Sequence, residues 1–175
     1  MRQRITIIIG IAALALVATT AALAGTLTTT GTITGVSGIS LNAPATAAFS
    51  KALDGTDLTA TYTAPIAITD ASGTGGGWKL TVAATTFVNG THTLAPGTIT
   101  GATQACHTNS SCTAATNSVT YPLTLGTTAA SAFNAALQTG LGQIDLTPAF
   151  SVAIPGNAYA GTYTSTVTLA ATTGP

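Results

Sequence analysis

Residues 144–154, IDLTPAFSVAI, decide the fold, because large apolar side chains recur there in a period of two. The apolar members are Ile144, Leu146, Phe150, Val152 and Ile154, and their neighbours are polar or small. This alternation is typical of a half-buried antiparallel strand with one face in a core. Residues 163–169, YTSTVTL, repeat it with threonines on the other face. Such a hydroxyl-rich, nearly uncharged face favours a β-protein that works outside the cell.

The same alternation continues between turns of glycine, proline and asparagine. It predicts further strands at residues 26–36, 39–49, 58–68, 78–82, 97–105 and 119–125. Residues 129–137, AASAFNAAL, instead show helical spacing, so we predict a short crossover helix there, capped by Thr127 or Thr128. About eight strands and this helix make an all-β antiparallel β-sandwich. The side chains expected to face its core are Trp78, Tyr62, Val82, Val119, Leu123, Phe150, Val152, Val167 and Leu169.

The N-terminus predicts export. Two arginines precede an apolar run over residues 5–23, and Ala22-Leu23-Ala24 has the small-x-small form of a signal peptidase site. We therefore expect a signal peptide at residues 1–24 and one mature domain at residues 25–175. An uncleaved membrane anchor is the alternative, since the apolar run nearly reaches spanning length. In either case the membrane is a partner only through this segment.

Charge and composition exclude several functions. Residues 25–175 carry two lysines and four aspartates, a formal balance of −2, which is too little positive charge for nucleic-acid binding. Neither His92 nor His107 has an apparent acid partner in the sequence, and the chain has no glutamate. Asp145 alternates with apolar neighbours, so we expect it to face solvent. We therefore predict a protein that is not an enzyme and needs no cofactor.

The cysteine pair predicts a disulfide. Cys106 and Cys112 enclose HTNSS, and a close, even pair in an exported chain is typical of a disulfide bond. A zinc site that uses His107 is the alternative, but zinc takes about four ligands and no spacing brings in His92. Calcium at Asp54, Asp57 and Asp70 is a weaker alternative, because Asp-Gly is also ordinary turn chemistry.

Two stretches, GGGWKLTVAATTF at residues 75–87 and AGTYTSTVTLAATTGP at residues 160–175, resemble the WxL-domain family of bacterial surface proteins. The resemblance places the first Trp-x-Leu motif at Trp78-Lys79-Leu80 and covers the chain from about Phe49 to Pro175. A second Trp-x-Leu is usual in the last strand, where this chain has Leu169-Ala170-Ala171. The family implies export and non-covalent attachment to the cell wall through peptidoglycan, with both motifs implicated.

Trp78 and Leu80 are therefore the wall-binding candidates. Trp78 shares a strand face with Leu80 and Val82, which favours a core position, and a sugar-stacking platform is the alternative. Two functions remain open for the exported domain. The first is a surface module that holds to cell-wall polysaccharide or peptidoglycan. The second is self-association into an extracellular filament or surface layer by strand exchange, in which residues 26–36 pair with a neighbour.

Overall fold

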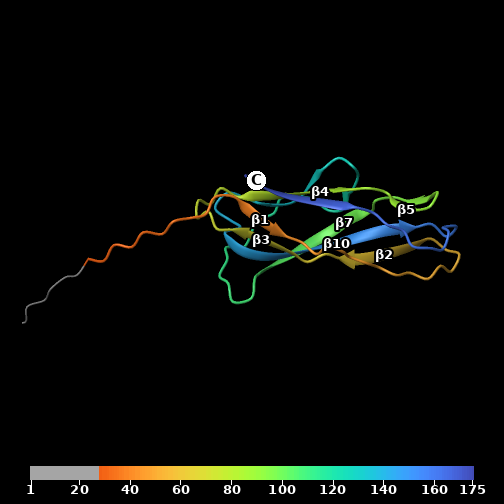
Figure 1. Ribbon diagram of the computed structural model, residues 1–175, viewed down its shortest axis with the longest axis horizontal. Helices are drawn as coiled ribbons and strands as arrows, with labels where there is room; N and C mark the ends of the chain where they lie inside the picture. The colour runs from red at the N-terminus through yellow and green to blue at the C-terminus, as the bar shows by residue number, and fades with distance from the viewer. Residues whose placement is uncertain (1–27) are drawn as a thin grey trace, which may run out of the picture. The chain divides into compact units, whose positions relative to one another are not determined.

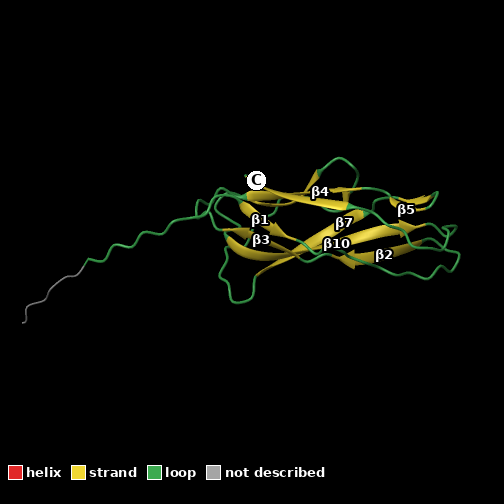
Figure 2. Ribbon diagram, in the orientation of Figure 1, coloured by secondary structure: helices red, strands yellow, loops and turns green. Residues whose placement is uncertain are grey.

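The computed structural model describes residues 28–175, which form antiparallel strands and no helix (Figures 1 and 2). Chain contacts divide the protein into residues 1–32 and residues 33–175, and every described strand lies in the second unit. No helix that could cross a membrane occurs within residues 28–175. The signal peptide predicted at residues 1–24 lies outside the described residues.

Eleven strands are found in the described part of the chain. They are β1 (Ile39–Asn42), β2 (Leu58–Thr63), β3 (Ile66–Asp70), β4 (Trp78–Ala84), β5 (Phe87–Asn89), β6 (His92–Leu94), β7 (Thr98–Cys106), β8 (Leu123–Thr124), β9 (Ala130–Ala135), β10 (Gly142–Ile154) and β11 (Val167–Thr173). They form a six-stranded sheet, a three-stranded sheet and a two-stranded hairpin.

The six-stranded sheet is organised around β10. Its order is β1-β3-β10-β7-β8, and β2 also pairs with β10. The strand predicted over residues 58–68 is interrupted before Pro65, because proline has no N–H for a ladder, and so it becomes β2 and β3. β10 is long enough to pair with both, through Ile144 opposite Ile68 and Phe150 opposite Tyr62. The period of two in β10 sends each even-numbered side chain from Ile144 to Ile154 into the core.

The three-stranded sheet has the order β11-β4-β9 and shares one core with the larger sheet. Trp78, Leu80 and Val82 of β4 are fully buried in this core beside Ile144 and Leu146 of β10. In Figure 1, β4 lies over β7 and β10. The hairpin of β5 and β6 joins this sheet through a bridge between Val88 and Thr164, just before β11.

The crossover helix predicted at residues 129–137 is wrong, because this segment contains β9. A β-bulge explains the misleading spacing: Phe133 lies opposite Leu80 and Ser131 lies opposite Thr81, which leaves Ala132 as the extra residue. The bulge places Ala130 and Phe133 on the same side of β9, opposite Val82 and Leu80, which creates the three-residue spacing that suggested a helix. Leu137, which the helical spacing placed on the same face as Ala130 and Phe133, is exposed.

The strand predicted at residues 26–36 is also wrong over the described part, residues 28–36. These residues belong to no strand, and all of them are exposed. Ile33, expected in the core, is 99% exposed. Only the end of the segment is attached, where the Val36 N–H donates to the Ala71 carbonyl over 2.9 Å.

The all-β, antiparallel class is confirmed, but the strand count and the sheet arrangement differ from a sandwich of about eight strands. Most of the expected core is found. Trp78, Val82, Phe150 and Val152 are buried, and Tyr62, Leu123, Val167 and Leu169 pack half-buried against the core. Val119 is half-buried and lies outside the strands.

The predicted disulfide between Cys106 and Cys112 is present, with the two Cα atoms 5.4 Å apart. Cys106 ends β7, and Cys112 forms a bridge with Gly142 at the start of β10. The bond therefore closes the loop that follows β7 against the central strand. The pairing also excludes the alternative in which these two thiols ligate zinc.

Trp78 should make a large contribution to stability. We expect Trp78→Ala to lower the free energy of unfolding by about 3–5 kcal/mol, because it empties a fully buried site. Urea denaturation monitored by far-UV circular dichroism measures this free energy. It does not depend on tryptophan fluorescence, which the variant lacks. Leu137→Ala, at a site 63% exposed, is the control and should change the free energy by no more than ~0.5 kcal/mol. A Trp78→Ala loss below about 1 kcal/mol would contradict the burial described here.

The exported protein should contain no alkylatable thiol until it is reduced. Reduction should then lower the free energy of unfolding by roughly 2 kcal/mol, as expected for a loop this short. Mass spectrometry after alkylation, and denaturation with and without reductant, measure the two effects. The double variant Cys106→Ala/Cys112→Ala is the control and should not respond to reductant. Two modified thiols in unreduced protein would show that the bond does not form.

Candidate functional site

Trp78 and Leu80, the wall-binding candidates from the sequence, are both fully buried. The Trp78 indole stacks on Phe133 at a centroid distance of 5.8 Å, and its Nε1–H donates to the Gly140 carbonyl over 2.9 Å. Gly140 has no room for a side chain, since a Cβ there would lie 2.6 Å from Nε1. The core position is therefore confirmed, and the ring offers no open face on which a sugar can stack.

The place of the second Trp-x-Leu lies directly beside the first. In the register of β11 on β4, Leu169 is opposite Val82 and Ala171 is opposite Leu80. Leu169 packs half-buried against the core and lines a groove. A leucine and an alanine thus stand on the strand next to Trp78, where the resemblance expects a tryptophan and a leucine.

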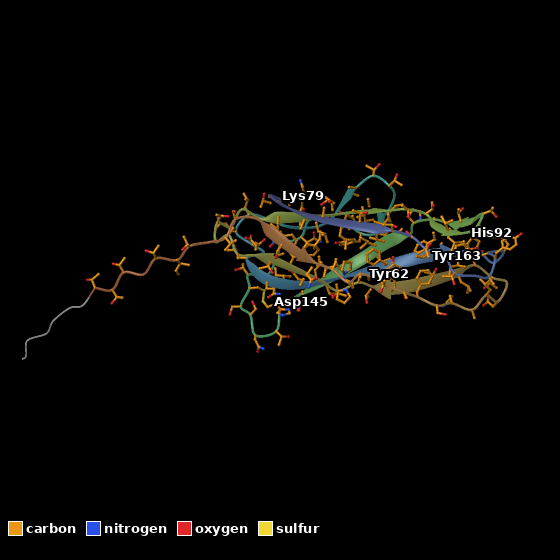
Figure 3. The ribbon with its side chains drawn as sticks, viewed as in Figure 1. Tyr62, Lys79, His92, Asp145 and Tyr163 are labelled. Atoms are coloured by element: carbon orange, nitrogen blue, oxygen red, sulfur yellow. A yellow bond between two sulfur atoms is a disulfide. The ribbon has the colours of Figure 1, made fainter. Side chains whose placement is uncertain are left out.

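A stacked aromatic pair with one exposed ring lies at one end of the domain. The rings of His92 and Tyr159 stack with centroids 3.8 Å apart and planes 13° apart, and Tyr159 is 64% exposed. Tyr163 and Asn89 lie next to this pair, so we call Asn89, His92, Tyr159 and Tyr163 the tip cluster. Figure 3 shows His92 and Tyr163 at the same end, away from Lys79 and Asp145.

Local hydrogen bonds hold the tip cluster in place. Gly90, at φ 61°, allows the tight turn that brings His92 opposite Asn89 in the β5–β6 hairpin. The Tyr163 hydroxyl donates to the Tyr159 carbonyl over 3.1 Å. Gly161 packs so closely on Asn89 that a Cβ would come within 2.1 Å of Nδ2. His92 therefore lies on a tight hairpin, and Tyr159 lies on a loop that hydrogen bonds hold in place.

The two halves of the tip cluster come from neighbouring strands. The hairpin that carries His92 follows β4 after two residues, and the loop that carries Tyr159 leads into β11. Val88 and Thr164 join the halves by two backbone hydrogen bonds of 2.9 and 3.0 Å. This site could not be predicted from the sequence, because only the tertiary fold brings residue 92 against residue 159.

A groove of about 930 Å³ runs from the tip cluster along the side of the domain. Its walls are residues 44–53, residues 158–165, Val167 and Leu169, and we call it the seam groove. Tyr62, Phe150 and Phe87 lie in its floor. Tyr62 stacks between Phe150, at 4.8 Å, and Phe49, at 5.6 Å. Burial raises the pKa of the Tyr62 phenol above its usual value, so the floor stays uncharged at physiological pH.

His107 has an acid partner, contrary to the expectation from the sequence. Its Nδ1 lies 2.9 and 3.0 Å from the two carboxylate oxygens of Asp145, and both side chains are 43% exposed. The pairing of β7 with β10 creates this contact, 38 residues apart. Within residues 28–175 no hydroxyl is hydrogen-bonded to the His107 ring, so the pair is not arranged as a nucleophile–base–acid triad. The contact connects the loop that follows β7 to β10.

The aspartates considered for calcium do not come together. Asp54 accepts hydrogen bonds from the backbone and the side chain of Thr56, two residues later, in a local turn. These hydrogen bonds lower the pKa of the Asp54 carboxyl. Asp57 accepts a hydrogen bond from the Gly156 N–H over 2.8 Å, and the buried Asp70 accepts two from Ser72. Across residues 28–175 no group of three metal-binding side chains is present. Each carboxylate is thus occupied by turn or loop contacts.

Comparison with known proteins gives one result that covers almost the whole domain. The search found no matching curated protein and no matching solved structure. A family model described as "WxL domain surface cell wall-binding" matches residues 28–172, which include β1 to β10 and nearly all of β11. The chain therefore belongs to the WxL domain family of surface cell wall-binding domains.

Proposed function

We propose that this protein is an exported surface module that attaches without a covalent bond to the peptidoglycan or polysaccharide of the cell wall, through the tip cluster. Membership of a surface cell wall-binding family supports the general function. The stacking of the exposed Tyr159 on the half-buried His92 is the observation that carries the choice of site. Export relies on the proposed signal peptide at residues 1–24.

The chemistry of the tip cluster suits a sugar ring. A tyrosine ring offers an apolar face to the C–H face of a pyranose and a hydroxyl to its polar edge. Asn89 and His92 add hydrogen-bonding groups beside that ring. Stacking on His92 holds the Tyr159 ring in one orientation, which reduces the entropy lost on binding.

Trp78 and Leu80 would then serve attachment by position rather than by contact. They anchor β4 in the core, and β4 fixes both the hairpin that follows it and the partner strand β11. These two elements carry the halves of the tip cluster. The Trp-x-Leu motif is in this proposal the scaffold for a binding surface at the far end of the same strand pair.

Tyr159→Ala should weaken pelleting with purified cell wall by about three- to tenfold, because one aromatic contact contributes ~0.5–1.5 kcal/mol. Tyr159→Phe keeps the ring and should retain most of the affinity. Leu137→Ala removes an exposed apolar side chain outside the tip cluster and is the matched control. If Tyr159→Ala pellets like the unaltered protein, the tip cluster is not the attachment site.

Release from intact cells should follow from the scarcity of charge. We expect a chaotrope to release the protein, and neither a chelator nor a rise in salt to do so, because stacking and hydroxyl contacts need no metal and are little screened. Immunoblots of the wash fractions measure this. Retention after chaotrope treatment would indicate a covalent link. Release by the chelator alone would instead assign attachment to a metal ion held by the aspartates.

A further inference from the structure

Residues 28–36, TTTGTITGV, have the composition of a strand but no partner. They lie outside every sheet, and Ile33 and Val36 are 99% and 69% exposed. Threonine and isoleucine favour strands. Two apolar side chains this exposed, Ile33 and Val36, could be buried by a binding partner. We call residues 28–36 the leading segment.

The leading segment is attached at the end of the domain opposite the tip cluster. Gly35 packs against Ser72, where a Cβ would lie 1.9 Å from the carbonyl oxygen, and Val36 is bonded to Ala71. Both contacts follow the end of β3, which is paired with the start of β10. The tip cluster lies beyond the other end of β10, about 40 Å away for a strand of 13 residues. β1 follows the leading segment in the chain and is in contact with β11.

The walls of the seam groove carry free backbone groups. Residues 44–53 make no hydrogen bond, backbone or side-chain, with any residue in the range 28–175. β11 pairs with β4 on one edge only, it lies near β1, and its Val167 and Leu169 side chains line the groove. An extended chain placed there can find backbone partners along a wall and an apolar floor beneath its alternate side chains.

The two surfaces also match in charge. The leading segment contains no charged residue, and Lys51 is the single charged residue among those that line the groove. The apolar floor of Tyr62 and Phe150 can receive Ile33 without burying a charge. Nine extended residues span about 30 Å, enough to follow residues 163–169 along their whole length.

We propose that the leading segment of one copy docks as an added strand in the seam groove of a second copy, beside β11, with Ile33 over the aromatic floor. Each copy has one donor and one groove at different places, so each head-to-tail contact leaves a free donor at one end and a free groove at the other. The expected product is an open chain of copies. The groove shares Tyr159 and Tyr163 with the tip cluster, so the variants that test docking, at Ile33 and Ala47, lie outside that cluster.

The experiment uses the full chain, expressed with its own N-terminal segment and recovered from outside the cell. Analytical ultracentrifugation over a range of concentrations measures self-association. Ile33→Asp places a charge in the docked face, and Ala47→Arg places a bulky cation on an exposed groove residue. Each should weaken self-association by about tenfold or more, because an unpaired charge enters an apolar groove. Thr32→Asp, on the opposite face of the segment, and Ala95→Arg, exposed outside the groove, are the matched controls.

Mixing the two variants gives the sharper result. Ile33→Asp keeps an intact groove and Ala47→Arg keeps an intact leading segment, so an equimolar mixture should form dimers that neither variant forms alone. Circular dichroism melting of each variant should match the unaltered protein. The proposal is overturned if the unaltered protein stays monomeric at every concentration, if Ile33→Asp associates normally, or if the mixture stays monomeric. Loss of wall pelleting in Ala47→Arg with unchanged oligomers would assign the groove to a glycan and also overturn it.

Discussion

The hydrogen bond from the Trp78 indole to the Gly140 carbonyl joins the two sheets of the domain at their shared core. Trp78 begins β4 of the smaller sheet, and Gly140 stands two residues before β10 of the larger one. An indole N–H without a partner in this core would cost about 1–3 kcal/mol, so the bond makes full burial of the ring tolerable. Gly140 is required because any side chain there would enter the space of the ring and of Ala135. The position of β4, and hence of everything built on it, follows from this contact.

That contact changes the meaning of the Trp-x-Leu motif in this chain. Tryptophans at protein surfaces often contribute much of the binding energy, but here the tryptophan and the leucine of the motif are both buried. The pair of strands β4 and β11 transmits their position to the hairpin and loop at the other end. The proposed wall attachment and the proposed self-association use surfaces that adjoin at Tyr159 and Tyr163: the tip cluster presents an aromatic ring and polar groups, whereas the seam groove presents an apolar floor and free backbone groups.

Period-two patterns predicted the fold where a strand has one clear core face. β10 and β4 were found this way, because their apolar residues alternate without interruption. The pattern failed at β9, where a bulge places Ala130 and Phe133, three residues apart, on the same side. It also failed at residues 28–36, because alternation describes the ability to pair and says nothing about the presence of a partner.

The disulfide could be predicted from a spacing of six residues, but the other site contacts could not. His107 meets Asp145, and His92 meets Tyr159, only through the pairing of distant strands and loops. Trp78 is the single tryptophan, so its fluorescence reports directly whether the motif or the tip cluster meets the wall. The decisive measurement is acrylamide quenching of this fluorescence with and without saturating peptidoglycan. Our account predicts little quenching in either state and an unchanged emission spectrum. Strong quenching of the free protein, with protection by peptidoglycan, would contradict it.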